Sequence, residues 1–202
     1  MKEQISVRQY RRIDLILFAV ILAVFESVVV TAAVRWFPGE PYMVSVTAAV
    51  TAIVMMRWGP WAAIHAVLGG AVLCLLSGVG KSQPLQYAVY GLGNLGGLAA
   101  LALRKKLGSE RIRGSDLWTL AFGAAALLGM QTGRAAVSLL LTGNAGAVVM
   151  YFAPEAVTML FTLVLMGIAR RIDGLFEDQR HYLARVRRQG PAEDAEDEGG
   201  FQ

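Results

Sequence analysis

The sequence predicts an all-α, polytopic membrane protein built as a bundle of six transmembrane helices. Hydrophobic residues make up 55% of the 202-residue chain and charged residues only 17%, whereas about a quarter of the residues in a soluble domain are charged. The hydrophobic residues gather in stretches of nearly the length that crosses a bilayer, and most basic residues lie between them. This composition excludes a disordered chain and an ordinary soluble enzyme. The single cysteine excludes an internal disulfide and a multi-cysteine metal site.

Six stretches of the sequence approach the roughly 20 apolar residues that a helix needs to cross the hydrocarbon core. The first is too long for a signal peptide, and Glu26 and Arg35 stand where a cleavage site would need small residues. The second and third nearly join, and Pro60 suits the first turn of a helix, so we expect a tight hairpin between them. The six expected spans are 13–34, 42–56, 59–76, 85–103, 117–142 and 146–168.

The basic residues predict how these spans are oriented. Six spans leave both termini on one side of the membrane, and every lysine and arginine except Arg35, Lys81 and Arg134 falls on that side. Because cytoplasmic loops are the ones enriched in basic residues, we expect cytoplasmic N- and C-termini in a multi-pass protein of the cell membrane. The basic residues thus belong to the borders of the lipid bilayer, and the formal net charge of +4 indicates no nucleic-acid partner.

We expect a six-helix transmembrane domain over 1–171 and a cytoplasmic segment over 172–202. Apolar and charged positions alternate over 172–188, which is typical of an amphipathic helix lying on the inner leaflet. Residues 190–202 contain a proline and a run of acidic residues. We interpret that run as a disordered, solvated terminus.

Polar side chains recur at helical spacing in the last three expected spans. Residues separated by three, four or seven positions share one face of a helix. Arg134 lies roughly 12 Å from the outer end of its span, and Asn94 and Glu155 roughly 14 Å from theirs, at about 1.5 Å per residue. We therefore predict a cavity between these spans that opens outward and binds a small molecule. Its predicted lining is Gln86, Tyr90 and Asn94 in the fourth span, Gln131, Arg134 and Ser138 in the fifth, and Tyr151, Glu155 and Thr158 in the sixth.

Each residue type in this set suits a ligand contact. Arg134 would pair with a carboxylate or phosphate, which the guanidinium geometry favours, and Glu155 would meet an amine or hold Arg134. The two tyrosines would stack on a ring. The alternative for Arg134 and Glu155 is an ion pair that joins two helices without any ligand. His65 is interpreted as a packing residue, and Lys81 as either an anion-attracting or a solvated loop residue.

The sequence contains no catalytic or metal-binding constellation. It has no Ser/His/Asp arrangement, no His-Glu-x-x-His motif and no phosphate-binding loop. We therefore expect no enzymatic activity, no cofactor and no metal, and any ATP use must come from a partner.

Small residues spaced by four positions allow membrane helices to approach closely. Gly93 and Gly97, and Gly129 and Gly133, are expected to serve packing within the bundle. A third pair stands in the first span, at Ala19 and Ala23.

The layout resembles the substrate-binding S components of energy-coupling factor (ECF) vitamin transporters. The resemblance covers 13–168 and rests on six short spans with both ends cytoplasmic, together with local motifs. These motifs are Ala19-x-x-x-Ala23 in the first span and Gly59-Pro60-Trp61, followed by Gly69-Gly70 and Ser77-Gly78.

The resemblance implies a membrane-embedded component that captures a vitamin-like micronutrient outside a bacterial or archaeal inner membrane. It implies that Ala19 and Ala23 pack on a membrane-embedded coupling subunit, which two cytoplasmic ATPases drive. It also implies that helices four to six form most of the ligand site. Glu26 shares the helix face of Ala19 and Ala23, so we expect it outside the ligand site.

Two alternatives remain. A membrane scaffold protein of cell-wall synthesis, resembling the MreD family, has a similar size and number of spans, and its polar stripes would only hold helices together. The second alternative is a membrane sensor domain.

Overall fold

The computed structural model describes residues 6–38, 44–152, 155–179 and 182–184, and these residues form helices, turns and no strands. Four helical runs are long and apolar enough to cross a membrane, which confirms an all-α protein of the membrane class. They are Val7–Trp36, Thr47–Leu76, Asp116–Thr142 and Val149–Arg170. Six spans, and the side of the membrane on which the termini lie, remain predictions.

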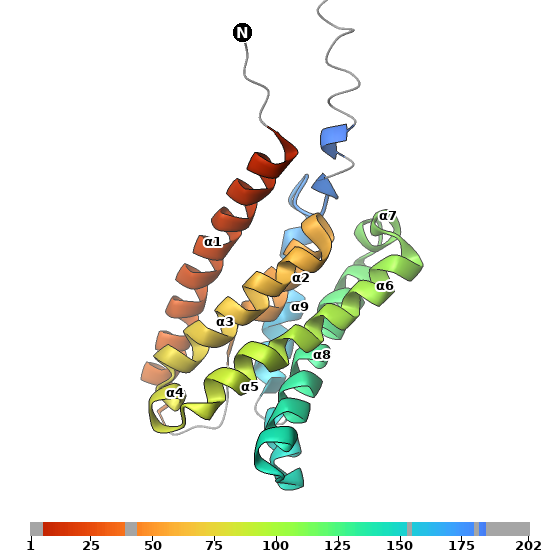
Figure 1. Ribbon diagram of the computed structural model, residues 1–202. Helices are drawn as coiled ribbons and strands as arrows, with labels where there is room; N and C mark the ends of the chain where they lie inside the picture. The colour runs from red at the N-terminus through yellow and green to blue at the C-terminus, as the bar shows by residue number, and fades with distance from the viewer. Residues whose placement is uncertain (1–5, 39–43, 153–154, 180–181, 185–202) are drawn as a thin grey trace, which may run out of the picture.

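The first half of the chain contains a long helix and a hairpin of two short ones (Figure 1). Helix α1 begins with a capping box, in which the Ser6 hydroxyl accepts from the Gln9 backbone and the Gln9 side chain accepts from the Ser6 backbone. The bounds are α1 Val7–Trp36, α2 Thr47–Trp58, the 3₁₀ turn η1 Gly59–Ala62 and α3 Ala63–Leu76.

The apolar run Thr47–Leu76 is not one straight helix, because the chain reverses within it. Gly59 has a φ of 64°, which ends α2. Gly69 in α3 lies directly against Thr47 at the start of α2, since a Cβ on Gly69 would fall 2.1 Å from Thr47 Oγ1. The hairpin predicted at Pro60 is therefore present. All 12 residues of α2 are buried, so this short helix lies at the centre of the bundle.

The second half returns to the same end of the bundle through interrupted helices. The expected span 85–103 changes to a 3₁₀ turn in its middle, where glycines are dense. The expected span 146–168 starts as a 3₁₀ turn and becomes α-helical only from Ala156. The bounds are α4 Val79–Ser82, α5 Leu85–Gly93, η2 Asn94–Ala99, α6 Ala100–Leu107, α7 Ser109–Arg113, α8 Asp116–Thr142, η3 Ala145–Tyr151 and α9 Ala156–Arg170.

Glycines let α5 and η2 touch α8 backbone to backbone. A Cβ on Gly133 would fall 2.1 Å from the Gly93 carbonyl oxygen, and one on Gly96 would fall 2.3 Å from the Gly129 carbonyl oxygen. The packing role expected for these glycines is thus observed. The close approach brings the side chains that follow Gly93 and Gly133 together.

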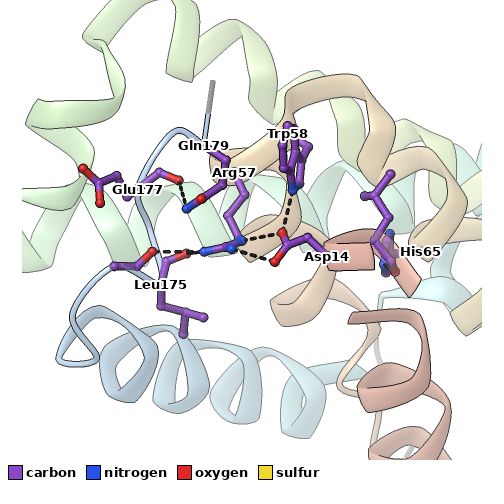
Figure 2. A network of polar contacts seen from close by, with 9 residues as sticks. Asp14, Arg57, Trp58, His65, Leu175, Glu177 and Gln179 are labelled. Carbon is purple, nitrogen blue, oxygen red and sulfur yellow. Dashed lines mark hydrogen bonds and ion pairs between the residues drawn. The ribbon is translucent and has the colours of Figure 1, made fainter. Parts of the chain in front are cut away.

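A buried polar network joins the start of α1, the end of α2 and the segment after α9 (Figure 2). The Asp14 carboxylate accepts two hydrogen bonds from Arg57, at 2.9 and 2.7 Å, and one of 2.5 Å from the Trp58 indole. Arg57 also donates to the carbonyl oxygens of Gly174 and Leu175. The start of α1 and the segment after α9 therefore lie at the same end of the bundle (Figure 1).

The first part of the segment after α9 differs from the amphipathic helix expected over 172–188, whereas Gln179 and residues 182–184 are helical and residues 180–181 and 185–188 lie outside the described part of the chain. Residues 171–177 form turns and bends. Arg57 holds the carbonyl groups of Gly174 and Leu175, and Phe176 is buried in the main apolar core. Arg104 extends the attachment with a 2.5 Å ion pair to Asp178. The expected acidic tail lies outside the described residues.

One side of α1 carries an exposed apolar surface. Its residues lie at helical spacing and are more than half exposed, as lipid-facing or partner-facing residues of a membrane helix would be. They are Ile13, Ile16, Leu17, Val20, Val24, Phe25 and Val28.

Candidate ligand-binding site

Arg134 is the centre of a buried polar cluster formed by η2, α8 and the start of α9. Its side chain is 3% exposed, and its Nη1 atom forms an ion pair with Glu155 Oε1. Its Nε atom donates to Asn94 Oδ1 at 2.6 Å. The guanidinium carbon lies 4.6 Å from the centre of the Tyr90 ring, within the range of a cation–π interaction. Four predicted site residues thus meet at one point.

Two amides hold the ion pair in place. Asn94 donates through Nδ2 to the Ala66 carbonyl oxygen of α3 at 2.9 Å, which leaves its oxygen facing Arg134. Gln131 donates through Nε2 to Glu155 Oε2 at 3.3 Å. Asn94 therefore binds Arg134 and also links the cluster to α3, whereas Gln131 binds Glu155.

The backbone explains why these side chains meet. Asn94 follows Gly93, whose missing side chain allows the α8 backbone at Arg134 to approach: a Cβ there would fall 2.5 Å from Arg134 Cα. On the other side of Asn94, a Cβ on Gly70 would fall 2.9 Å from Asn94 Nδ2. Glycines on two neighbouring helices therefore make the space that Asn94 and Arg134 occupy.

An aromatic and amide edge borders the cluster. The Tyr90 and Tyr151 rings meet edge to face, with centres 6.2 Å apart. Tyr151 donates to Gln86 Oε1 at 3.4 Å, and Gln86 donates to Gln83. The chain of contacts from Gln86 through the tyrosines to Arg134 brings together seven of the nine predicted residues.

The remaining two predicted residues are buried beside the cluster. Ser138 lies one turn beyond Arg134 on α8, and its carbonyl oxygen accepts from Thr142. Thr158 lies on α9 close to Glu155 and is 1% exposed.

Glu26, expected outside the site, is a buried acidic residue of α1. Its exposed fraction is 0%, and its Oε2 atom accepts a 2.9 Å hydrogen bond from the Val46 backbone N–H. Ala19 and Ala23, which share its helix face in the sequence, are only half-buried, because the alanines lie at the edge of that face. Glu26 therefore points into the bundle, towards the start of α2, and its placement outside the ligand site stays a prediction. A charge inside an apolar span was the signal that could have placed it in the bundle.

The other singled-out residues occupy separate places. His65 is buried and donates through Nε2 to the Leu15 carbonyl oxygen at 3.1 Å, as a packing histidine would. Lys81 is exposed in the short helix α4. Within the described part of the chain, no group of three or more His, Cys, Asp or Glu is arranged to hold a metal.

Comparison of the chain with protein-family models, with curated proteins and with solved structures finds no match. The arrangement of the residues themselves therefore carries the functional argument. The cluster offers a cation, an anion, two amides and two aromatic rings within a few ångströms, which is a set suited to recognising a small polar molecule.

Proposed function

We propose that this protein is the membrane-embedded substrate-binding component of an ECF-type importer and captures a small, vitamin-like molecule. The observation that carries the proposal is the buried cluster around Arg134, which gathers ionic, amide and aromatic groups from η2, α8 and α9. Ionisable residues inside a membrane bundle are costly and mark functional sites more often than they serve packing alone.

In the proposed mechanism the ligand inserts between the partners of the cluster. Arg134 and Glu155 exchange part of their mutual contact for a carboxylate and an amine of the ligand, so that no charge is left unpaired. Asn94 and Gln131 supply further donors, and Tyr90 and Tyr151 pack on an apolar or ring-shaped part. In this mechanism the ligand enters from the end of the bundle opposite the one that holds the termini.

The energy for uptake comes from partner subunits in this proposal. The sequence has no phosphate-binding loop, so a coupling subunit in the membrane and two cytoplasmic ATPases supply ATP hydrolysis. Ala19 and Ala23 lie beside the exposed apolar surface of α1. Two small residues one turn apart allow the backbone of another helix to approach there.

The proposal is tested by identifying small molecules bound to the purified protein. The full chain is expressed in its native host, purified in detergent and denatured, and the released molecules are identified by mass spectrometry. We expect one small molecule at close to one equivalent per chain. A protein that releases nothing, and that no fraction of a host metabolite extract stabilises against thermal unfolding, would rule out the proposed binding function.

One observation favours a second candidate, a membrane scaffold protein of the MreD type. The polar groups of the cluster pair with one another: Arg134 with Glu155 and Asn94, and Glu155 with Gln131. Such a closed network could hold helices together without a ligand. Under this reading no small molecule copurifies, and variants of the cluster change only the stability.

Bulky substitutions at the α1 alanines are expected to separate ligand capture from uptake. Ala19→Trp combined with Ala23→Trp puts two large side chains where the coupling subunit would approach, so uptake by cells should fall at least about tenfold, the equivalent of roughly 1.4 kcal/mol. The amount of small molecule bound to the purified protein should stay unchanged. Leu160→Trp, at an exposed position of α9, is the matched control and should leave both quantities unchanged. Loss of binding together with uptake would argue against a partner surface at the alanines.

A further inference from the structure

A groove runs between α8 and α9 at the end of the bundle that holds the termini. The two helices pack against each other, and they touch at Gly123, where a Cβ would fall 2.6 Å from Met166 Cγ. Beside this contact a groove of about 430 Å³ opens on the surface of the bundle. Gly167 lines the groove, and a Cβ on Gly167 would meet no heavy atom within 4 Å. The missing side chain therefore leaves open space between the helices.

Most of the groove lining is apolar. Leu120 of α8 forms one wall, and α9 contributes Leu163, Val164 and Ile168 beside Gly167. The Val164 and Ile168 side chains are 49% and 55% exposed. In a membrane bundle these side chains face acyl chains, which are as apolar as leucine. The groove is therefore able to receive a lipid tail.

The length of the groove matches one leaflet of a bilayer. Leu163, Gly167 and Arg171 follow one another at four-residue spacing, so they share one face of α9 and its C-cap. They span roughly 12 Å at about 1.5 Å per residue, and half of the hydrocarbon core measures about 15 Å. An acyl chain that lies along the groove therefore reaches from the membrane border towards the midplane.

The groove ends at charged residues. Arg170 pairs with Asp116 there, and its Nε atom donates to the Arg113 carbonyl oxygen at 3.0 Å. The Arg113 side chain pairs with Glu110. Arg171 is exposed and also lines the groove, and no hydrogen bond or ion pair joins its side chain to another residue that the structure describes. Arg171 therefore leaves one positive charge uncompensated at the end of the groove.

The surrounding charged residues keep that balance positive. Lys105 and Lys106 are exposed at the end of α6, which packs on α8. Asp173, two residues after Arg171, lines a separate pocket beside Tyr10. A negatively charged headgroup is therefore attracted to this end of the groove, and a guanidinium group binds phosphate oxygens through two parallel hydrogen bonds.

We propose that the groove binds one anionic phospholipid, with an acyl chain along Gly167 and the headgroup phosphate on Arg171. The apolar lining accepts the chain, and the uncompensated charge selects a headgroup of net negative charge such as phosphatidylglycerol. A zwitterionic headgroup would bring its own ammonium group to an end of the bundle that is already rich in basic residues. The groove lies apart from the Arg134 cluster, so this inference does not depend on the binding function proposed above.

The test is native mass spectrometry of the full chain in detergent micelles, in which each bound lipid adds its own mass. The probes are palmitoyl-oleoyl phosphatidylglycerol and a phosphatidylcholine with the same chains, added at equal concentrations. We expect the wild type to bind one molecule of phosphatidylglycerol and to prefer it about fivefold, which is the contribution of roughly one arginine near a membrane surface.

Two variants separate the headgroup contact from the acyl-chain contact. Arg171→Gln should bind both lipids equally, because it removes the free charge and leaves the groove unchanged. Gly167→Phe should lower the binding of both lipids at least about tenfold, the contribution of roughly two buried methylene groups, because its ring fills the groove. The matched controls are Arg12→Gln, at an exposed arginine of α1 at the same end, and Leu140→Phe, at an exposed position of α8 at the other end. Both controls should bind lipid as the wild type does.

The outcomes test the two halves of the proposal. Equal binding of the two lipids to the wild type, or a loss of preference in Arg12→Gln as large as in Arg171→Gln, would overturn the contact between the headgroup and Arg171. Undiminished lipid binding by a folded Gly167→Phe would overturn the groove as the site. Because Arg171 is exposed and forms no described ion pair, Arg171→Gln should fold, and it decides the case even if Gly167→Phe does not fold.

Discussion

Arg134→Gln is expected to destabilise the protein by about 3–5 kcal/mol, the usual cost of removing one partner of a buried ion pair. The substitution leaves the buried Glu155 carboxylate, to which Gln131 donates, without its positively charged partner, and it removes the 2.6 Å hydrogen bond to Asn94. Equilibrium unfolding in mixed detergent micelles measures the change. A variant as stable as the wild type would contradict the buried pairing.

Adding Glu155→Gln to this variant should recover most of the lost stability. The double variant leaves no unpaired charge at these two positions, and the two new amides can still hydrogen-bond each other, Asn94 and Gln131. We expect it within about 1 kcal/mol of the wild type, so that the coupling between the two positions is large. A double variant that remains as unstable as Arg134→Gln would show that the loss comes from packing and not from charge.

Gly133→Ala is expected to destabilise the protein by roughly 3 kcal/mol, at the upper end of the cost of overpacking. The added Cβ would fall 2.1 Å from the Gly93 carbonyl oxygen. A backbone atom cannot rotate away as a side chain can, so α8 and α5 must separate, and Arg134 then moves away from Asn94. Unfolding in mixed micelles measures the stability, and the amount of bound small molecule reports on the site.

Gly167→Ala is the matched control for this prediction. Gly167 lies in α9, and a Cβ there would meet no heavy atom within 4 Å. The same substitution should therefore be neutral or stabilise the helix by up to about 1 kcal/mol. If both substitutions destabilised the protein equally, the cost of Gly133→Ala would not come from the contact between α8 and α5.

Hydropathy and helical spacing predicted the all-α membrane class, the hairpin at Pro60 and the convergence of Arg134, Glu155 and Asn94. These features depend on local patterns: apolar length, a proline at a helix start, and polar residues on one helix face. The small-residue pairs likewise indicated where helices approach. Such properties can be read along the chain because a helix fixes the direction of each side chain.

The place of Glu26 could not be predicted in the same way. Helical spacing gives the face of α1 that Glu26 shares with Ala19 and Ala23. The position of the α2 N-terminus opposite Glu26 depends instead on the reversal at Gly59 and on the contact of Gly69 with Thr47. The turns after α9 also depend on a distant partner, since Arg57 and Arg104 hold them from the ends of other helices. Contacts between segments far apart in sequence carry no periodic signal.

The central claim is that the cluster around Arg134 binds a small molecule and does more than join helices. The most direct test is the amount of small molecule released on denaturation of the Arg134→Gln/Glu155→Gln double variant, compared with the wild type at matched, verified folding. We predict close to one equivalent from the wild type and almost none from the double variant. A folded double variant that releases the wild-type amount would contradict the claim.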